Sequence, residues 1–234
     1  MTQQTELGIV VALRPEWEAV SSMLDAASER EVVGRQVRFG CLSDLSVAVI
    51  RAGFGKTMAA GGAQALIDCC RPRLLVDSGT AGALTDRLDI GDVVLSRQVT
   101  DGDLAVDWAR TLALDEEAAE GLGALFAQTC QTNGRMLTTE HTVRSAAERA
   151  RLAGEGFDSV DWETFAVIKT AQVNEVPCLS VRVISDRADD QVAVDFMGQA
   201  VQYYERLVAA LRRTADILSS GSLPDLVWRH GSRQ

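Results

Sequence analysis

The sequence predicts a single three-layer α/β/α domain, in which helices cover both faces of a mixed, mostly parallel central sheet. Strands buried on both faces are predicted at three continuous apolar runs, Leu7–Leu13, Leu74–Asp77 and Cys178–Ile184. Helical segments separate these runs, and strands that alternate with helices are typical of a parallel sheet. The 234 residues contain no repeat, low-complexity tract or linker, so one domain is expected.

In the first half of the chain, Pro15 suits the first turn of a helix that we expect to run to about Ala26. Two strands joined by a short polar turn should follow, and then an Ala-rich helix that ends before Pro72. The strand Leu74–Asp77 should lead into a loop of small residues. The predicted ranges are Gln36–Leu42 and Leu45–Ala52 for the strand pair, Lys56–Cys70 for the helix, Ser78–Gly82 for the loop and Asp92–Ser96 for the next strand.

In the second half, four helical segments and two short strands are expected around the apolar strand Cys178–Ile184. The predicted helices are Asp115–Thr132, Arg144–Ala153, Glu163–Asn174 and the amphipathic Val192–Ser219, and the short strands are Arg135–Thr138 and Ser159–Val160. We place the domain at residues 1–220. The tail, residues 221–234, is expected to be loose or to act as an arm on a partner subunit.

Charge and cysteine content restrict the class of function. The formal net charge of −10 disfavours nucleic acid and anionic membrane as partners, whereas a small molecule in a pocket is permitted. No basic stretch precedes an apolar run at the N-terminus, and no run approaches the roughly 20 residues that span a bilayer. The five cysteines have no ligand-like spacing and are expected to be reduced thiols of a cytoplasmic protein. We expect no metal and no cofactor.

The glycine-rich segment Gly53–Thr57 resembles a nucleotide-binding loop only superficially. A phosphate loop needs a glycine five residues before the Gly-Lys-Thr, and that position is Ile50, inside a predicted strand. Position 58 is Met58, so the dinucleotide pattern also fails. The sequence therefore disfavours an NTPase or a dinucleotide enzyme.

Several functional side chains lie at or near the carboxyl ends of predicted strands. They are Glu16, Thr80, Glu163, Arg182 and Asp186. Each has a structural alternative, such as a helix cap or a tight turn. Together they favour a ligand site, because the carboxyl ends of parallel strands meet at one sheet edge. In the loop Ser78–Gly82, small residues such as Ala81 and Gly82 would let a ligand approach the backbone.

The order of motifs along the chain resembles the methylthioadenosine/S-adenosylhomocysteine nucleosidase group of the nucleoside phosphorylase superfamily. The motifs are L-G-I-V-V-A-L-x-x-E, A-G-F-G-K, D-S-G-T-A-G-A, I-G-D-V-V-L-S, V-D-W-E-T and V-R-V-I-S-D, over residues 7 to about 190. The resemblance implies a homodimer that acts on a purine nucleoside.

The resemblance also implies roles for individual residues. Glu16 would handle the attacking water, with the Thr80 hydroxyl close to that water. Glu163 would bind the ribose hydroxyls, Asp186 would protonate N7 of the departing purine, and Arg182 would line the site. These residue types suit cleavage of an N-ribosyl bond, whose transition state resembles an oxocarbenium ion.

Three departures from the group's pattern put the substrate in doubt. Trp162 stands where the group carries Met before the ribose glutamate, and Thr138–Thr142 replaces the stretch with a purine-stacking aromatic. Stacking on the purine is then either lost or supplied from elsewhere, with His141 and Phe54 as candidates. For His141 the sequence favours a surface or packing role over a catalytic one. Residues 97–103, which would shape the 5′-substituent pocket, are also unusual.

The sequence therefore predicts a purine nucleosidase that hydrolyses a methylthioadenosine- or S-adenosylhomocysteine-like nucleoside. Within the superfamily, a phosphate-dependent phosphorylase, a futalosine-hydrolase-like enzyme and a hopanoid-associated phosphorylase-like protein stay open. A non-catalytic nucleoside-binding protein is the alternative from another class. Intact Glu16, Glu163 and Asp186 argue against that alternative, because a binding protein does not need all three.

Overall fold

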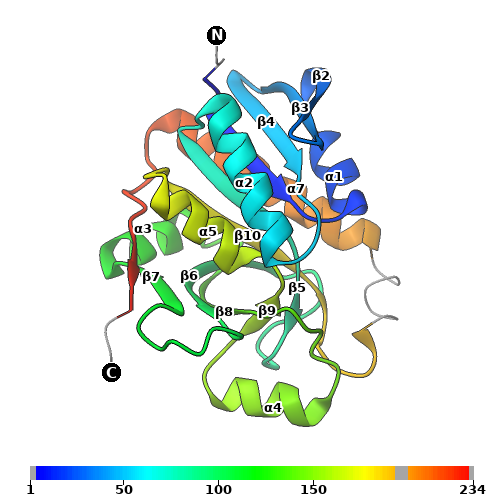
Figure 1. The fold of residues 1–234 in the computed structure, drawn as a ribbon, viewed down its shortest axis with the longest axis vertical. Helices are drawn as coiled ribbons and strands as arrows, with labels where there is room; N and C mark the ends of the chain where they lie inside the picture. The colour runs from blue at the N-terminus through cyan, green and yellow to red at the C-terminus, as the bar shows by residue number, and fades with distance from the viewer. Residues whose placement is uncertain (1–3, 193–199, 232–234) are drawn as a thin grey trace.

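The chain is described by a computed structural model that covers residues 4–192 and 200–231. Strands and helices alternate along most of this length (Figure 1). The strands are β1 (Leu7–Val11), β2 (Asp25–Val32), β3 (Arg35–Leu42), β4 (Leu45–Arg51), β5 (Leu74–Ala83), β6 (Val93–Asp101), β7 (Thr111–Leu114), β8 (Gln131–Thr138), β9 (Ser159–Asp161), β10 (Cys178–Asp186) and β11 (Trp228–His230). The helices are α1 (Arg14–Ser21), α2 (Lys56–Cys70), α3 (Glu116–Phe126), α4 (Ala146–Gly154), α5 (Thr164–Val173) and α7 (Ala200–Ser220).

The described strands form one mixed sheet whose central members run parallel. β1 pairs in parallel with β4 and β5, and β5 pairs in parallel with β10. On the other side of β10 the sheet curls, because β6 pairs with both β10 and β8, β8 pairs with β9, and β9 returns to β5. The parallel arrangement brings the carboxyl ends of β1, β5 and β10 to the same edge, which is where the sequence places its candidate residues.

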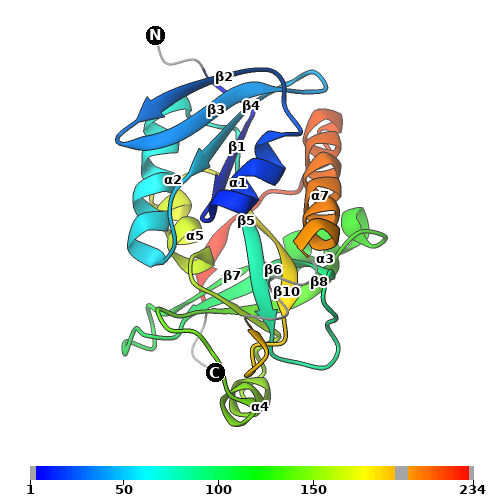
Figure 2. The same cartoon turned by 90° about the vertical axis from the view of Figure 1, so that its right-hand side faces the viewer.

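Helices cover both faces of the central sheet, as expected for three layers. Figure 2 shows α2 and α5 on one face, and α1 and α7 on the other. The core between the layers consists mainly of buried Val, Leu, Ile and Ala side chains. None of the described helices is long and apolar enough to cross a membrane. The predicted α/β/α fold class is confirmed.

The predicted first helix is too long. α1 ends at Ser21, and Asp25–Val32 forms the edge strand β2, which pairs with β3. Met23 and Leu24 are buried and continue the helical spacing of apolar residues, although the chain has already turned after Ser21. β2 itself is almost wholly exposed and carries no alternation of apolar residues, so the sequence did not predict this strand or its pairing with β3.

The loop expected at Ser78–Gly82 is instead part of a strand. β5 continues to Ala83, because its second half pairs with β10 on one side and with β9 on the other. The small residues that suggested a turn are those that fit between two neighbouring strands. Thr80, Ala81 and Gly82 therefore lie on a rigid strand.

Part of the tail, residues 221–234, is not loose as expected. Trp228–His230 forms β11, which pairs antiparallel with β7. The Trp228 indole is buried, and its Nε1 donates a hydrogen bond of 2.8 Å to the Cys178 carbonyl. These residues therefore pack against the domain, and the boundary at residue 220 stays a prediction. The first part of the long helix expected from Val192 falls mostly outside the described residues.

Candidate active site

A cavity of about 300 Å³ opens at the carboxyl ends of β1, β5, β9 and β10. Of the eight residues expected at the site, all but Arg182 line it. The lining comprises Leu13, Glu16, Thr80, Ala81, Gly82, Thr142, Val143, Arg144, Val160, Asp161, Trp162, Glu163, Ser185, Asp186, Ala188 and Val192. The volume is at the lower end of the range for small-molecule sites.

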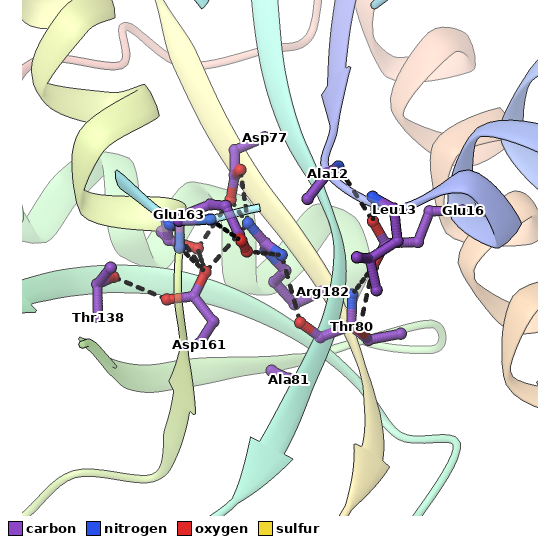
Figure 3. A network of polar contacts seen from close by, with 12 residues as sticks. Ala12, Leu13, Glu16, Asp77, Thr80, Ala81, Thr138, Asp161, Glu163 and Arg182 are labelled. Carbon is purple, nitrogen blue, oxygen red and sulfur yellow. Dashed lines mark hydrogen bonds and ion pairs between the residues drawn. The ribbon is translucent and has the colours of Figure 1, made fainter. Parts of the chain in front are cut away.

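Glu16 is held rigidly by four hydrogen bonds at the start of α1. One carboxylate oxygen accepts from the Ala12 and Leu13 amides at 3.1 and 2.8 Å. The other accepts from the Thr80 amide at 2.9 Å and the Thr80 hydroxyl at 3.0 Å (Figure 3). A carboxylate that is fixed in this way on a cavity wall is placed to accept a proton from a bound ligand or water.

Arg182 lies beneath the cavity and joins three carboxylates. Its Nε and Nη2 donate to the two oxygens of Asp77 at 3.0 and 2.7 Å. Nη2 also lies 3.0 Å from Asp161, and Nη1 lies 3.3 Å from Glu163 (Figure 3). Burial alone would lower the pKa of Arg182, but the three carboxylates raise it well above its ordinary value. The expected residue Arg182 is therefore a buried, charged support rather than part of the cavity lining.

Asp77 and Asp161 are partners that the sequence did not single out for this role. Besides Arg182, Asp77 accepts from the hydroxyls of Thr164 and Ser180 at 2.8 and 3.1 Å. Burial raises the pKa of Asp77, and the neighbouring Asp161 adds to this, while Arg182 opposes it. A carboxylate at the end of the apolar run L-L-V-D was the available signal, since an ionisable group there needs a buried partner.

Glu163 connects Arg182 to the loop before α2. Its Oε2 accepts from Arg182, and its Oε1 accepts from the Gly55 amide at 2.9 Å. Burial raises the pKa of Glu163 to about 8, with Asp161 and Glu16 adding to the effect and Arg182 opposing it. The charge of Glu163 is therefore sensitive to small changes near neutral pH.

The Gly55 amide is itself fixed by a group that we call the Lys56 clasp, made of Lys56, Asp101, Asp103 and Glu140. The Lys56 ammonium donates to Asp101 at 2.6 Å and to Asp103 at 2.8 Å, and the Lys56 amide donates to Glu140 at 3.0 Å. The Glu140 amide in turn donates to Asp103 at 2.8 Å. The amides of Gly55 and Lys56, at the N-terminus of α2, thus donate to carboxylates, whereas in a phosphate loop such amides would donate to a phosphate.

Asp186 ends β10 and lines the cavity. Its carboxylate accepts from the Ser185 hydroxyl at 2.8 Å and from the Ala188 amide at 2.9 Å. A Cβ atom at Gly82 would lie 2.9 Å from an Asp186 oxygen, so the space beside this carboxylate requires glycine. Asp186 is thereby oriented in the same cavity as Glu16 and Glu163.

The aromatic and loop residues around the cavity differ in part from expectation. Trp162 lines it and packs on Phe54, with ring centroids 6.2 Å apart. His141, a candidate for stacking, is exposed and contacts Glu148 at 3.1 Å instead of lining the cavity. Thr142–Arg144 supply the wall there. Thr142 belongs to the stretch expected at the purine, whereas the sequence did not assign Val143 and Arg144 to the site.

Comparison with known proteins places this geometry in a family. The family described as "Phosphorylase superfamily" matches residues 6–215. The chain belongs to the phosphorylase superfamily. Among the relatives, the 5'-methylthioadenosine/S-adenosylhomocysteine nucleosidase of Haemophilus ducreyi is 26% identical over 207 residues, which are 79% of this chain and 86% of the relative.

Solved structures of superfamily members share the fold. The corresponding nucleosidase from S. pneumoniae, solved with the transition-state inhibitor MT-ImmA, has a TM-score of 0.80 at 22% identity and covers 89% of this chain and 97% of its own. Futalosine hydrolase of Helicobacter pylori has a TM-score of 0.82 at 21% identity and covers 92% and 98%. At such identities the likeness shows the fold alone, so substrate and reaction need a separate argument.

Proposed function

We propose that this member of the superfamily is a purine nucleosidase, which uses water to split a purine nucleoside into free base and sugar. The observation that carries the proposal is the convergence of Glu16, Glu163 and Asp186 on one cavity. They come from segments far apart in the sequence, and each carboxylate is oriented by its own hydrogen bonds. A site that only bound a neutral nucleoside would not need three carboxylates in it.

The proposed reaction uses one carboxyl group at each reacting point. The bond between the sugar and N9 breaks, and its electron pair leaves with the base, where the Asp186 carboxyl supplies a proton to N7. The sugar develops positive charge, which the Glu163 carboxylate stabilises through the ribose hydroxyls. Water adds to the anomeric carbon, and Glu16 accepts its proton. Thr80, whose hydroxyl touches Glu16, would help to place that water.

Charge in the cavity supports water rather than phosphate as the nucleophile. Four carboxylates line it, those of Glu16, Asp161, Glu163 and Asp186. The guanidinium of Arg182 is already shared by three carboxylates, and carboxylates occupy the first amides of α2. A phosphate beside Glu16 would therefore meet the like charge of these carboxylates, against a single cation, Arg144, among the described residues that line the cavity. A phosphorylase is the less favoured alternative.

A panel of nucleosides tests the proposal. Purified protein is mixed with methylthioadenosine, S-adenosylhomocysteine, adenosine and inosine, each with and without phosphate, and the free base is measured. Release of base without phosphate supports the nucleosidase. Release only with phosphate supports the phosphorylase, and binding without any release supports the non-catalytic alternative. The expected homodimer and the cytoplasmic location stay predictions.

A further inference from the structure

Arg144 is a cationic side chain on the cavity wall that the proposed reaction does not use. It lies in the loop before α4, lines the cavity and is exposed. Within residues 4–192 and 200–231 it forms no ion pair or side-chain hydrogen bond, whereas its neighbour Arg149 donates to Asp86 and to the Ala83 carbonyl. Arg144 is thus a donor facing the cavity with its hydrogen-bonding capacity free.

Packing places Arg144 on the Asp186 side of the cavity. The preceding residue, Val143, is buried in a small apolar cluster with Val160 and Ala188. The amide of Ala188 is the one that donates to Asp186 at 2.9 Å. Arg149 of α4 donates to the Ala83 carbonyl at 3.1 Å, which fixes the first turns of α4 against the end of β5. The residue before Ala83, Gly82, lies directly beside the Asp186 carboxylate.

Glu163 is held by other segments than those that hold Asp186. Its carboxylate oxygens are bound by Gly55, in the loop before α2, and by Arg182 beneath the cavity. The sugar would therefore lie toward the loop before α2, and the base toward Asp186 and the loop that carries Arg144.

The chemistry of purines indicates what Arg144 would meet. N7 and the substituent at position 6 are neighbours on the same edge of the base: guanine presents N7 and O6 as two acceptors, whereas adenine presents an acceptor and an amino donor. A side chain next to the group that serves N7 therefore faces the 6-substituent. Arginine has only donors, so it fits a 6-oxo group and leaves a 6-amino group unpaired.

We propose that Arg144 makes this site selective for 6-oxopurine nucleosides, such as inosine, over 6-aminopurine nucleosides, such as adenosine. The inference rests on the proposed function in one respect, namely that Asp186 serves N7. It makes the adenine nucleosides expected from the resemblance the poorer substrates. Because Arg144 is exposed to solvent, we expect a preference of about 10- to 100-fold in kcat/KM, which is within the range of one good base contact.

The test compares inosine with adenosine, and 5′-methylthioinosine with methylthioadenosine, in the wild type and in Arg144→Met. We expect the wild type to prefer the oxo member of each pair. Arg144→Met should lower kcat/KM for the oxo substrates at least 10-fold and change the amino substrates less than about 3-fold. Arg151→Met is the matched control, because Arg151 is an exposed arginine of α4 that pairs with Glu155 and does not line the cavity.

Two results would overturn the inference: a wild-type preference for the amino substrates, or an equal loss on both classes in Arg144→Met. Binding separates this failure from that of the proposed function. If no nucleoside is cleaved, titration calorimetry with hypoxanthine and adenine still decides, since hypoxanthine should bind more tightly to the wild type and lose that advantage in Arg144→Met. Equal affinities, or no binding of either base, would contradict the role of Arg144.

Discussion

Replacing Arg182 by methionine tests the buried charge network most severely. The substitution keeps an unbranched apolar side chain but removes the cation that faces Asp77, Asp161 and Glu163. Breaking a buried ion pair by removing one partner costs about 3–5 kcal/mol, because the other charge is left uncompensated. For a domain of this size, that loss corresponds to a fall in Tm of roughly 6–20 °C.

The loss should also depend on pH. Burial already raises the pKa of Asp77 and Glu163, and without Arg182 these groups would take up protons more readily still. Protonation removes the uncompensated charge, so the variant should lose less stability at pH 5 than at pH 7.5. Urea and thermal unfolding at both pH values measure this difference.

Two further variants keep the experiment interpretable. Arg87→Met removes an exposed arginine that lies 2.6 Å from Asp158, and it should change the free energy of unfolding by at most about 1 kcal/mol. Arg182→Lys keeps the charge and should fall between the wild type and Arg182→Met, which helps if the methionine variant does not fold. A loss below about 1 kcal/mol for Arg182→Met, or an equal loss at both pH values, would refute the reasoning.

Three other predictions follow from single contacts. Burial raises the pKa of Glu163 from its ordinary value of 4.5 to about 8 in the folded state, so its contribution to stability is greatest below pH 4.5 and is lost as pH rises through 8. Glu163→Gln should flatten this part of the stability profile, and a wild-type kcat/KM that did not rise toward pH 8 would contradict a role for the ionised form. Lys56→Met should loosen the clasp and reduce kcat/KM roughly 10-fold or more, with recovery in Lys56→Arg; unchanged exchange of the Gly55 amide by hydrogen exchange would contradict this route. Trp228→Ala should lower the free energy of unfolding by about 3–5 kcal/mol, measured in urea, whereas a loss below about 1 kcal/mol would show that β11 is not firmly packed.

The sequence predicted the fold where burial imposes a pattern. β1, β5 and β10 are buried along nearly their whole length, so they appear as apolar runs that no solvent-exposed segment would carry. β2 was missed because an exposed edge strand is specified by its neighbour's backbone and not by its own side chains. The continuation of β5 was missed because small residues suit both a turn and a strand between two others.

In the site, too, the sequence pattern indicated some residues, whereas others depend on contacts that form only in the fold. Glu16, Glu163 and Asp186 could be singled out, because each follows or ends a strand at the edge where parallel strands deliver their carboxyl ends. Their supports could not, since they come from contacts between distant segments: Gly55 lies 108 positions from Glu163, and Asp77 lies 105 positions from Arg182. Arg144 was not assigned to the site because only the packing of Val143 brings its loop to the cavity.

A crystal structure with a free purine base bound would test the central claim most directly. The claim requires that one ligand meets all three carboxyl groups at different points. We expect N7 of the base within about 2.6–3.2 Å of an Asp186 oxygen, with N9 directed toward Glu163 and Glu16. A base bound outside this cavity, or one whose N9 points away from both glutamates, would contradict the account.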